Sequence, residues 1–363
     1  MHKVGGASRW TQIGIGEFVA DYASRWDVLN NRHYGGHPLF DSRFVFALLR
    51  HFPASGVAVW LLGDPREPRG IVLLERGRAG VWRSFQRSQA QVSPVMLAPE
   101  DLGAVTDLFG AISPVAQMID FLCQDPRFSP WRSGSSGVPA LRTSHTLTAS
   151  ISLEGSFDHY WKARPKGLRQ TIARSLRRAE AEGAPVSLRF VESPEEIGGA
   201  VREFGLMESR GWKGAQGTAV NPENAQGRFY AEVFEAFART NQAIAYELYA
   251  GDLAISRQLA LTSGSMCITL KTTHEEAYRH LSPGRVLDYE MLRLEFERRR
   301  FDRIELYTDA DQAQLRWTTS DRWIEHVSCF RSSLAQATYT IARSALSGLR
   351  RLSGGPAAQP GNS

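Results

Sequence analysis

Apolar and polar positions follow two periodicities along this chain, and together they predict an α/β protein. Alternation with period two predicts strands over 57–62, 70–74, 81–85, 145–153, 186–191, 243–249, 253–261, 266–271, 303–306 and 323–330. Apolar residues three and four apart predict helices near 19–29, 42–52, 102–111, 156–183 (broken at Pro165), 197–204, 221–237, 286–300, 311–317 and 334–352. Residues 115–122 fit either a strand or a helix.

The second half of the chain is organised around residues 264–306, which predict a strand, a loop, a long helix and a second strand. The helix starts at Ser282-Pro283-Gly284-Arg285. Serine is a good N-cap, proline suits the first helical position, and glycine leaves the first N–H groups accessible. Such a helix end attracts anions, and Arg285 adds a positive charge. The alternative is an ordinary helix start without a ligand.

The helix itself is apolar on two nearly opposite sides. Leu287, Met291 and Leu294 share one side, and Tyr289, Leu292 and Phe296 share the other. We therefore expect it to lie between two layers, which would hold its N-terminus rigidly.

Composition adds limits to this picture. The chain has 363 residues, of which 42% are hydrophobic and 22% charged, as in a soluble globular protein of two domains. A Ser-, Gly- and Pro-rich segment at 130–139 predicts the boundary, with domains at 1–135 and 136–333 and a basic helix and disordered tail at 334–363. The three cysteines have neither disulfide-framework nor zinc spacing, so no metal is expected. Without a signal peptide or membrane span, we expect a cytoplasmic protein.

Three short motifs resemble a known family. They are Trp161…Arg164-Pro165-Lys166…Arg169…Arg174…Arg177-Arg178…Glu182-Gly183, Glu208-Ser209-Arg210-Gly211-Trp212-Lys213, and Tyr278…Leu281-Ser282-Pro283-Gly284. Together with the element order, they resemble the GNAT acyltransferase fold, and within it the BioF2-like or CelD-type branch. This branch is related to the Fem-type transferases, so the resemblance implies two GNAT-like halves in tandem.

The resemblance also implies a function. Members bind acyl-CoA with its pyrophosphate at the helix after the fourth strand, and CelD-like relatives are associated with exopolysaccharide production. The leading expectation is a CoA-dependent acyltransferase, an acetyltransferase using acetyl-CoA, that modifies an amine or hydroxyl of a sugar or cell-envelope intermediate. One departure concerns the acceptor: the branch's Gly-Asp…Tyr-Lys pattern is replaced by Ala310-Asp311…Arg316-Trp317, without the tyrosine.

Acyl transfer to an amine needs positioning, a base and a donor for the leaving thiolate. As catalytic candidates we take Glu208, His274 and Tyr278. Glu208 could instead be a solvated charge at a helix end, and His274 a loop histidine.

The binding candidates fall into two groups. For the cofactor they are Lys271, Ser282, Gly284 and Arg285, although Lys271 could also be a surface lysine at a strand end. For the acceptor they are Trp212, Lys213 and Asp311, which the resemblance implies.

Residues 162–178 carry seven lysines and arginines and no acidic residue. A solvated basic helix face is one explanation; an anionic acceptor, an RNA or an anionic membrane surface are others. The alternative functions are a Fem-type aminoacyl-tRNA-dependent transferase and a catalytically inactive scaffold in polysaccharide assembly. In the leading interpretation nucleic acid is not a partner, and the basic, periodic stretch 334–352 could contact an anionic membrane.

Overall fold

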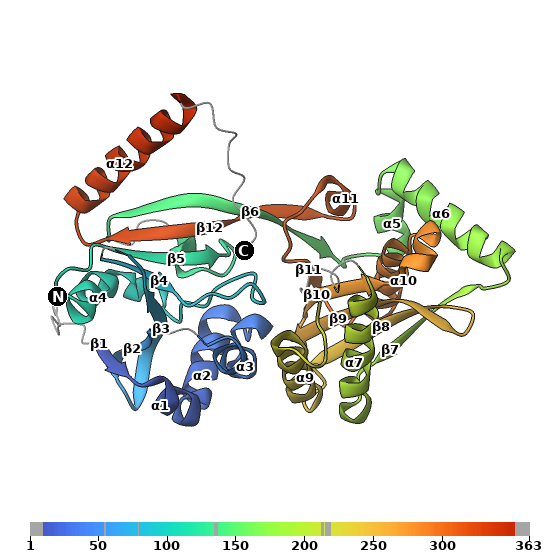
Figure 1. Cartoon of the computed structure of the whole chain (residues 1–363), viewed down its shortest axis with the longest axis horizontal. Helices are drawn as coiled ribbons and strands as arrows, with labels where there is room; N and C mark the ends of the chain where they lie inside the picture. The colour runs from blue at the N-terminus through green and yellow to red at the C-terminus, as the bar shows by residue number, and fades with distance from the viewer. Residues whose placement is uncertain are drawn as a thin grey trace. The chain divides into compact units, whose positions relative to one another are not determined.

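The computed structural model describes residues 10–53, 56–78, 80–133, 137–211, 214 and 219–352 (Figure 1). Two compact units account for them. Unit 1 comprises the described parts of Met1–Ser42, Ala54–His145 and Trp323–Ser363, and unit 2 comprises those of Arg43–Pro53 and Thr146–Arg322. The domain limits expected at 135 and 333 stay a prediction.

Unit 1 is built on a mixed sheet in the order β1-β2-β3-β4-β5-β12. Its strands are β1 (Trp10–Ile13), β2 (Val57–Asp64), β3 (Glu67–Arg76), β4 (Val81–Ser84), β5 (Met118–Gln124) and β12 (Ser320–Phe330). Its helices are α1 (Ile15–Asp21), α2 (Ala23–Tyr34), α4 (Val105–Ile112) and α12 (Ser333–Leu352). The first four strands pair antiparallel, β4 and β5 pair parallel across the crossover that contains α4, and β5 pairs antiparallel with β12.

Unit 2 repeats this topology. Its strands follow the order β7-β8-β9-β10-β11-β6 and are β6 (Ala140–Ser152), β7 (Val186–Val191), β8 (Ala243–Ala250), β9 (Leu253–Ser263), β10 (Met266–His274) and β11 (Arg303–Glu305). Four strands pair antiparallel, β10 and β11 pair parallel, and β11 pairs antiparallel with β6. The α/β class is confirmed, and the repeated strand order is what two tandem halves predict.

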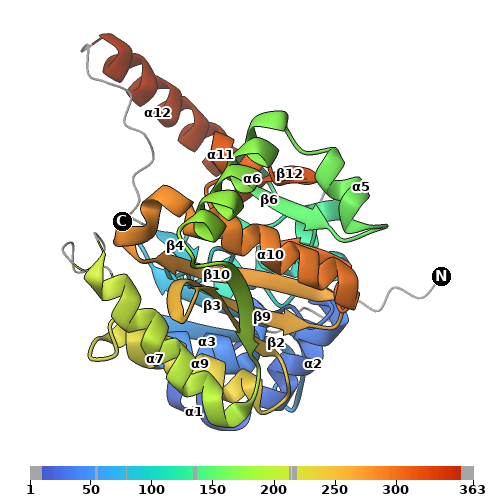
Figure 2. The same cartoon turned by 90° about the vertical axis from the view of Figure 1, so that its right-hand side faces the viewer.

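Helices cover both faces of the sheet in unit 2 (Figure 2). On one face lie α5 (Phe157–Lys162), α6 (Lys166–Ala181) and α10 (Pro283–Arg298); on the other lie α7 (Pro194–Arg210) and α9 (Ala225–Ala238). The helix α3 (Ser42–His51) belongs to this unit and contacts α9, where the rings of Phe44 and Phe229 meet edge to face at 5.3 Å.

The central helix α10 lies between the sheet and the helices α5 and α6, as its two apolar sides predict. Its far end is fixed by the fully buried Glu295, which accepts hydrogen bonds from the Tyr246 hydroxyl at 2.9 Å and from Arg300 at 2.6 Å. Buried charges need such partners, because an unpaired one would be strongly destabilising. The C-terminal end of α10 is thereby held in a defined position.

The structure corrects several local predictions. Residues 115–122, which fitted either element, contain the start of the strand β5. The single helix expected near 19–29 is two helices, α1 and α2, and the short strand β1 was not predicted. Ser282 precedes α10 as expected, but it makes no side-chain cap; it adopts a left-handed conformation with φ of 50°.

Among the described residues, no helix is long and apolar enough to cross a membrane. The described residues also contain no group of three or more His, Cys, Asp or Glu side chains that could hold a metal ion. The three cysteines, Cys123, Cys267 and Cys329, are all buried thiols.

Candidate functional site

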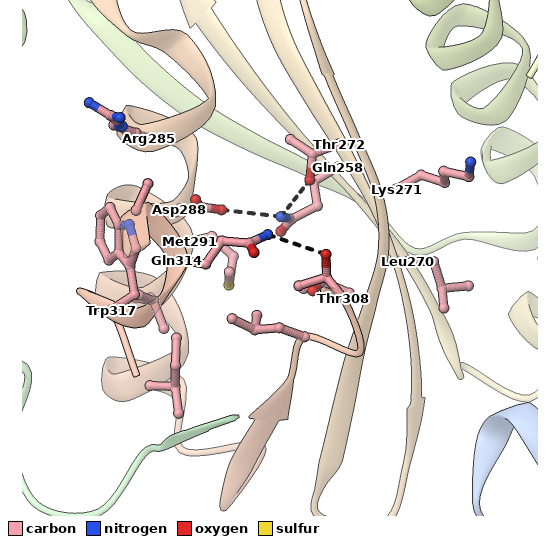
Figure 3. Close-up of a pocket in the computed structure, with 15 residues that line it drawn as sticks. Gln258, Leu270, Lys271, Thr272, Arg285, Asp288, Met291, Thr308, Gln314 and Trp317 are labelled. Atoms are coloured by element: carbon pink, nitrogen blue, oxygen red, sulfur yellow. Dashed lines mark hydrogen bonds between the residues drawn. The ribbon is translucent and has the colours of Figure 1, made fainter. Parts of the chain in front are cut away.

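A pocket of about 390 Å³ opens in unit 2 where the strands β10 and β11 separate (Figure 3). The two strands pair only from Met266 to Ile268, opposite residues 303–305. β11 then ends, whereas β10 continues to His274 after an irregularity between Thr269 and Lys271. A strand that loses its neighbour presents unpaired N–H and C=O groups. The gap therefore offers backbone hydrogen bonds to an extended ligand.

The helix α10 and the short helix α11 (Gln312–Leu315) form the other walls of this pocket. From α10 come Arg285, Asp288 and Met291, and from the α11 segment come Gln314 and Trp317 (Figure 3). The pocket therefore combines an apolar wall with a few polar groups, as small-molecule sites usually do.

Asp288 is the titratable group that the pocket perturbs most clearly. Its carboxylate accepts a hydrogen bond from Gln258 Nε2 at 3.2 Å, and the same nitrogen donates to Thr272 Oγ1 at 3.0 Å (Figure 3). Burial raises the pKa of the Asp288 carboxyl to about 7, although the hydrogen bond from Gln258 and the charge of Arg285 act in the opposite direction. A carboxyl with this pKa can both accept and release a proton near neutral pH.

The other end of the Gln258 amide has an unused acceptor. Gln258 is 3% exposed, and its Oε1 receives no hydrogen bond from any residue that the structure describes. Buried polar atoms are nearly always satisfied, so an exception beside a pocket is a natural place for a ligand N–H.

Only some of the residues predicted to bind the cofactor lie at this pocket. Arg285 lines the pocket, and Gly284 lies beside it: a Cβ at Gly284 would meet the Thr272 methyl at 4.0 Å. The backbone N–H groups of Arg285 and Val286 both donate to the Ser282 carbonyl, at 3.0 and 3.1 Å. Lys271 contributes to the lining, but its ammonium points to the opposite side of β10, 5.8 Å from the centre of the Tyr230 ring (Figure 3).

The predicted catalytic residues lie elsewhere. Glu208 is at the end of α7, as expected, but it is not a solvated charge: it is 2% exposed and accepts from the Val220 N–H at 2.7 Å. His274 ends β10, and Tyr278 lies in the 3-10 helix η4 (Glu276–Leu281), packed partly against the core. None of the three lines the pocket described above.

The predicted acceptor residues have different outcomes. Asp311 is the N-cap of α11: its carboxylate accepts from the Gln314 N–H at 2.8 Å, and the Gln314 side chain accepts from the Asp311 N–H at 3.2 Å. This capping box accounts for Asp311 structurally. Trp212 and Lys213 lie outside the described residues.

Sequence reasoning missed Asp288 and Gln258. A weak signal existed for each: Gln258 belongs to a polar group, Ser256-Arg257-Gln258, between the apolar ends of a predicted strand, and Asp288 lies one turn after Gly284. Neither pattern reveals that the two side chains meet, because that depends on how α10 packs against β9.

Comparison with known proteins agrees with the fold of unit 2. Residues 166–315 match the family model described as an acetyltransferase (GNAT) domain, so this part of the chain has the GNAT fold. No curated protein sequence matches the chain significantly.

Solved structures resemble the chain over nearly its whole length. FemX has a TM-score of 0.56 at 9% identity, covering 91% of this chain and 99% of its own. The C-terminal domain of a protein from Agrobacterium fabrum, described as a lysylphosphatidylglycerol synthetase, has a TM-score of 0.52 at 12% identity, with 90% and 97% covered. At these identities the likeness concerns the fold alone.

Proposed function

We propose that this GNAT-fold protein is a CoA-dependent acyltransferase, using acetyl-CoA, and that the pocket between β10, β11 and α10 binds the donor. The acceptor we propose is an amine or hydroxyl of a sugar or cell-envelope intermediate in exopolysaccharide synthesis, by analogy with the BioF2-like or CelD-type branch. The observation that carries the proposal is the gap where β10 loses its pairing with β11, closed on one side by the N-terminus of α10.

Each part of acyl-CoA has a matching feature in this gap. The pantetheine arm is extended and contains two amides, so it can pair with the free edge of β10 as an added strand would. One of its N–H groups could donate to Gln258 Oε1, which lacks a protein donor in the described chain. The pyrophosphate would lie at the start of α10, beside Gly284 and Arg285, where the helix dipole and the arginine favour an anion.

Asp288 is the proton-transfer group we propose for this site. The acceptor nitrogen or oxygen attacks the thioester carbonyl, the C–S bond breaks, and the proton of the nucleophile passes to the Asp288 carboxylate. The neutral carboxyl can then return a proton to the thiolate. General acid–base help of this kind contributes roughly 10²–10⁴-fold. Glu208, His274 and Tyr278 stay alternative candidates, and Lys271, Trp212, Lys213 and Asp311 stay predicted contacts.

Calorimetry with acetyl-CoA tests the donor site through Gly284. A glutamate there places negative charge where the pyrophosphate would lie, so we expect at least about a tenfold loss of affinity. The matched control is Gly284→Ala, because its methyl group meets nothing closer than 4.0 Å and should leave binding almost unchanged. Equal affinities for the glutamate and alanine variants would remove the helix N-terminus from the proposal.

A second candidate is a Fem-type transferase that uses aminoacyl-tRNA. The full-length similarity in fold to FemX favours it, together with the exposed basic residues of α6 such as Arg174 and Arg177. Other basic residues of the same segment have structural partners: Arg169 donates to the Arg164 carbonyl at 3.1 Å, and Arg178 to the His280 carbonyl at 3.2 Å.

Peripheral contact of α12 with an anionic membrane also stays a proposal. The exposed Leu334 and Ile341 of this helix would face the lipid.

A further inference from the structure

Unit 1 contains a second pocket, of about 400 Å³, that neither the motifs nor the proposed acyl transfer accounts for. One wall is the helix α2 and the other is the turn between β2 and β3 together with the start of β3. Four arginines line it, two from each wall: Arg25, Arg32, Arg66 and Arg69. On α2 the spacing of 25, 28, 29 and 32 places these side chains on one face of the helix.

The two walls are fastened to each other. Arg25 Nε donates to the Arg66 carbonyl at 2.8 Å, which fixes the helix against the turn. Arg25 also donates to the carbonyl of Asp21 at 2.6 Å, so its guanidinium is held by backbone oxygens rather than by a carboxylate. The contact between the two walls of the pocket therefore leaves the positive charge of Arg25 unneutralised.

The lining of this pocket is mainly cationic. Four arginines and one acidic residue, Glu67, line the pocket. Beside it, Asp101 pairs with Arg69 at 3.1 Å, and the Asp64 carboxylate accepts a hydrogen bond from the Arg66 N–H at 2.8 Å. Within the described residues no carboxylate pairs with the guanidinium of Arg32 or of Arg66. The guanidinium groups of Arg32 and Arg66 therefore lie in one concave site without a carboxylate partner in the described chain, and like charges held together repel each other unless an anion joins them.

We propose that this pocket binds a small phosphorylated molecule with at least two negative charges, such as a diphosphate. Arginine suits this class, because its planar guanidinium donates two parallel hydrogen bonds to phosphate oxygens. Val28 and Leu29 add an apolar patch, and the volume exceeds that of a diphosphate, so the ligand would carry an organic group as well. The inference does not rest on the acyl-CoA site, which lies in the other unit.

Calorimetry with inorganic pyrophosphate tests the proposal on the full-length protein. We expect saturable binding that weakens as salt rises. The double variant Arg32→Gln/Arg66→Gln should weaken it by about tenfold or more, since each lost charged hydrogen bond matters. The matched control is Arg76→Gln, an exposed arginine at the far end of the same strand β3, which should leave binding unchanged.

Two further arms make the result specific. Gly284→Glu, which perturbs the proposed CoA site, should retain this pyrophosphate binding, so failure of one site is distinguishable from failure of the other. Vesicles that contain phosphatidic acid, whose phosphomonoester headgroup can carry two negative charges, identify the source of the phosphate: binding that pyrophosphate displaces indicates a lipid headgroup, and no vesicle binding indicates a free metabolite. The proposal is overturned if millimolar pyrophosphate does not bind, or if the double variant binds as well as Arg76→Gln.

Discussion

Replacing Asp288 by asparagine should stabilise the protein at alkaline pH while it impairs catalysis. The folded chain raises the pKa of this carboxyl to about 7, from 3.8 in the unfolded chain. Between these values the folded state holds a proton that the unfolded state has released, so the free energy of unfolding falls as pH rises. Above pH 8 the ionised carboxyl costs up to about 4 kcal/mol of stability.

Asparagine removes this cost and keeps an acceptor for the Gln258 hydrogen bond. We therefore expect the asparagine variant to gain several kcal/mol relative to the wild type at pH 8.5 and much less at pH 4, where the folded carboxyl is neutral and the unfolded one is only about half ionised. Urea unfolding, followed by the fluorescence of the nine tryptophans, measures both differences. Asp302→Asn, at an exposed carboxylate in the same unit, is the control.

The kinetic counterpart uses the same variant. If ionised Asp288 accepts the proton, the acyl-transfer rate should rise with pH through an apparent pKa near 7, and the asparagine variant should lose this rise along with roughly 10²–10⁴ of the rate. Binding of acetyl-CoA should be retained. A stability difference that is the same at pH 4 and 8.5, with an unaltered pH–rate profile, would refute the assignment of a raised pKa to Asp288.

Two other predictions concern the alternatives. If the donor is an aminoacyl-tRNA, RNA affinity should fall steeply with salt and disappear in Arg174→Gln/Arg177→Gln; acetyl-CoA binding without salt-sensitive RNA binding would exclude that donor. If Glu208 or His274 is the base, Glu208→Gln or His274→Ala should lower turnover roughly 10²–10⁴-fold at nearly constant CoA affinity; wild-type rates in both would leave Asp288 as the remaining carboxylate candidate.

The hydrophobic periodicity of the sequence predicts most elements of unit 2, because long, strongly periodic segments are the easiest to recognise. The strand β10, the helix α10 and its proline at the first position follow directly from this pattern. The strand β1 was missed because four residues are too few to show alternation. The left-handed Ser282 was missed because serine rarely adopts this conformation.

Features that depend on tertiary packing were not accessible in the same way. Glu208 looked like a solvated helix end, and only the approach of Val220 to its carboxylate shows that it is buried. The arginine-lined pocket joins α2 to a turn about forty residues later, and no short motif connects the two. Sites formed by residues that are far apart in the sequence can be identified only from the three-dimensional structure.

The buried cysteines can report whether the two units of the protein unfold cooperatively. Cys123 and Cys329 lie in unit 1 and Cys267 in unit 2, and burial raises the pKa of each thiol. A thiol reagent in native buffer can therefore modify them only during transient opening, at a rate set by the opening free energy of the surrounding structure. Mass spectrometry of the time course would show whether the two units open together or one after the other, without any engineered label.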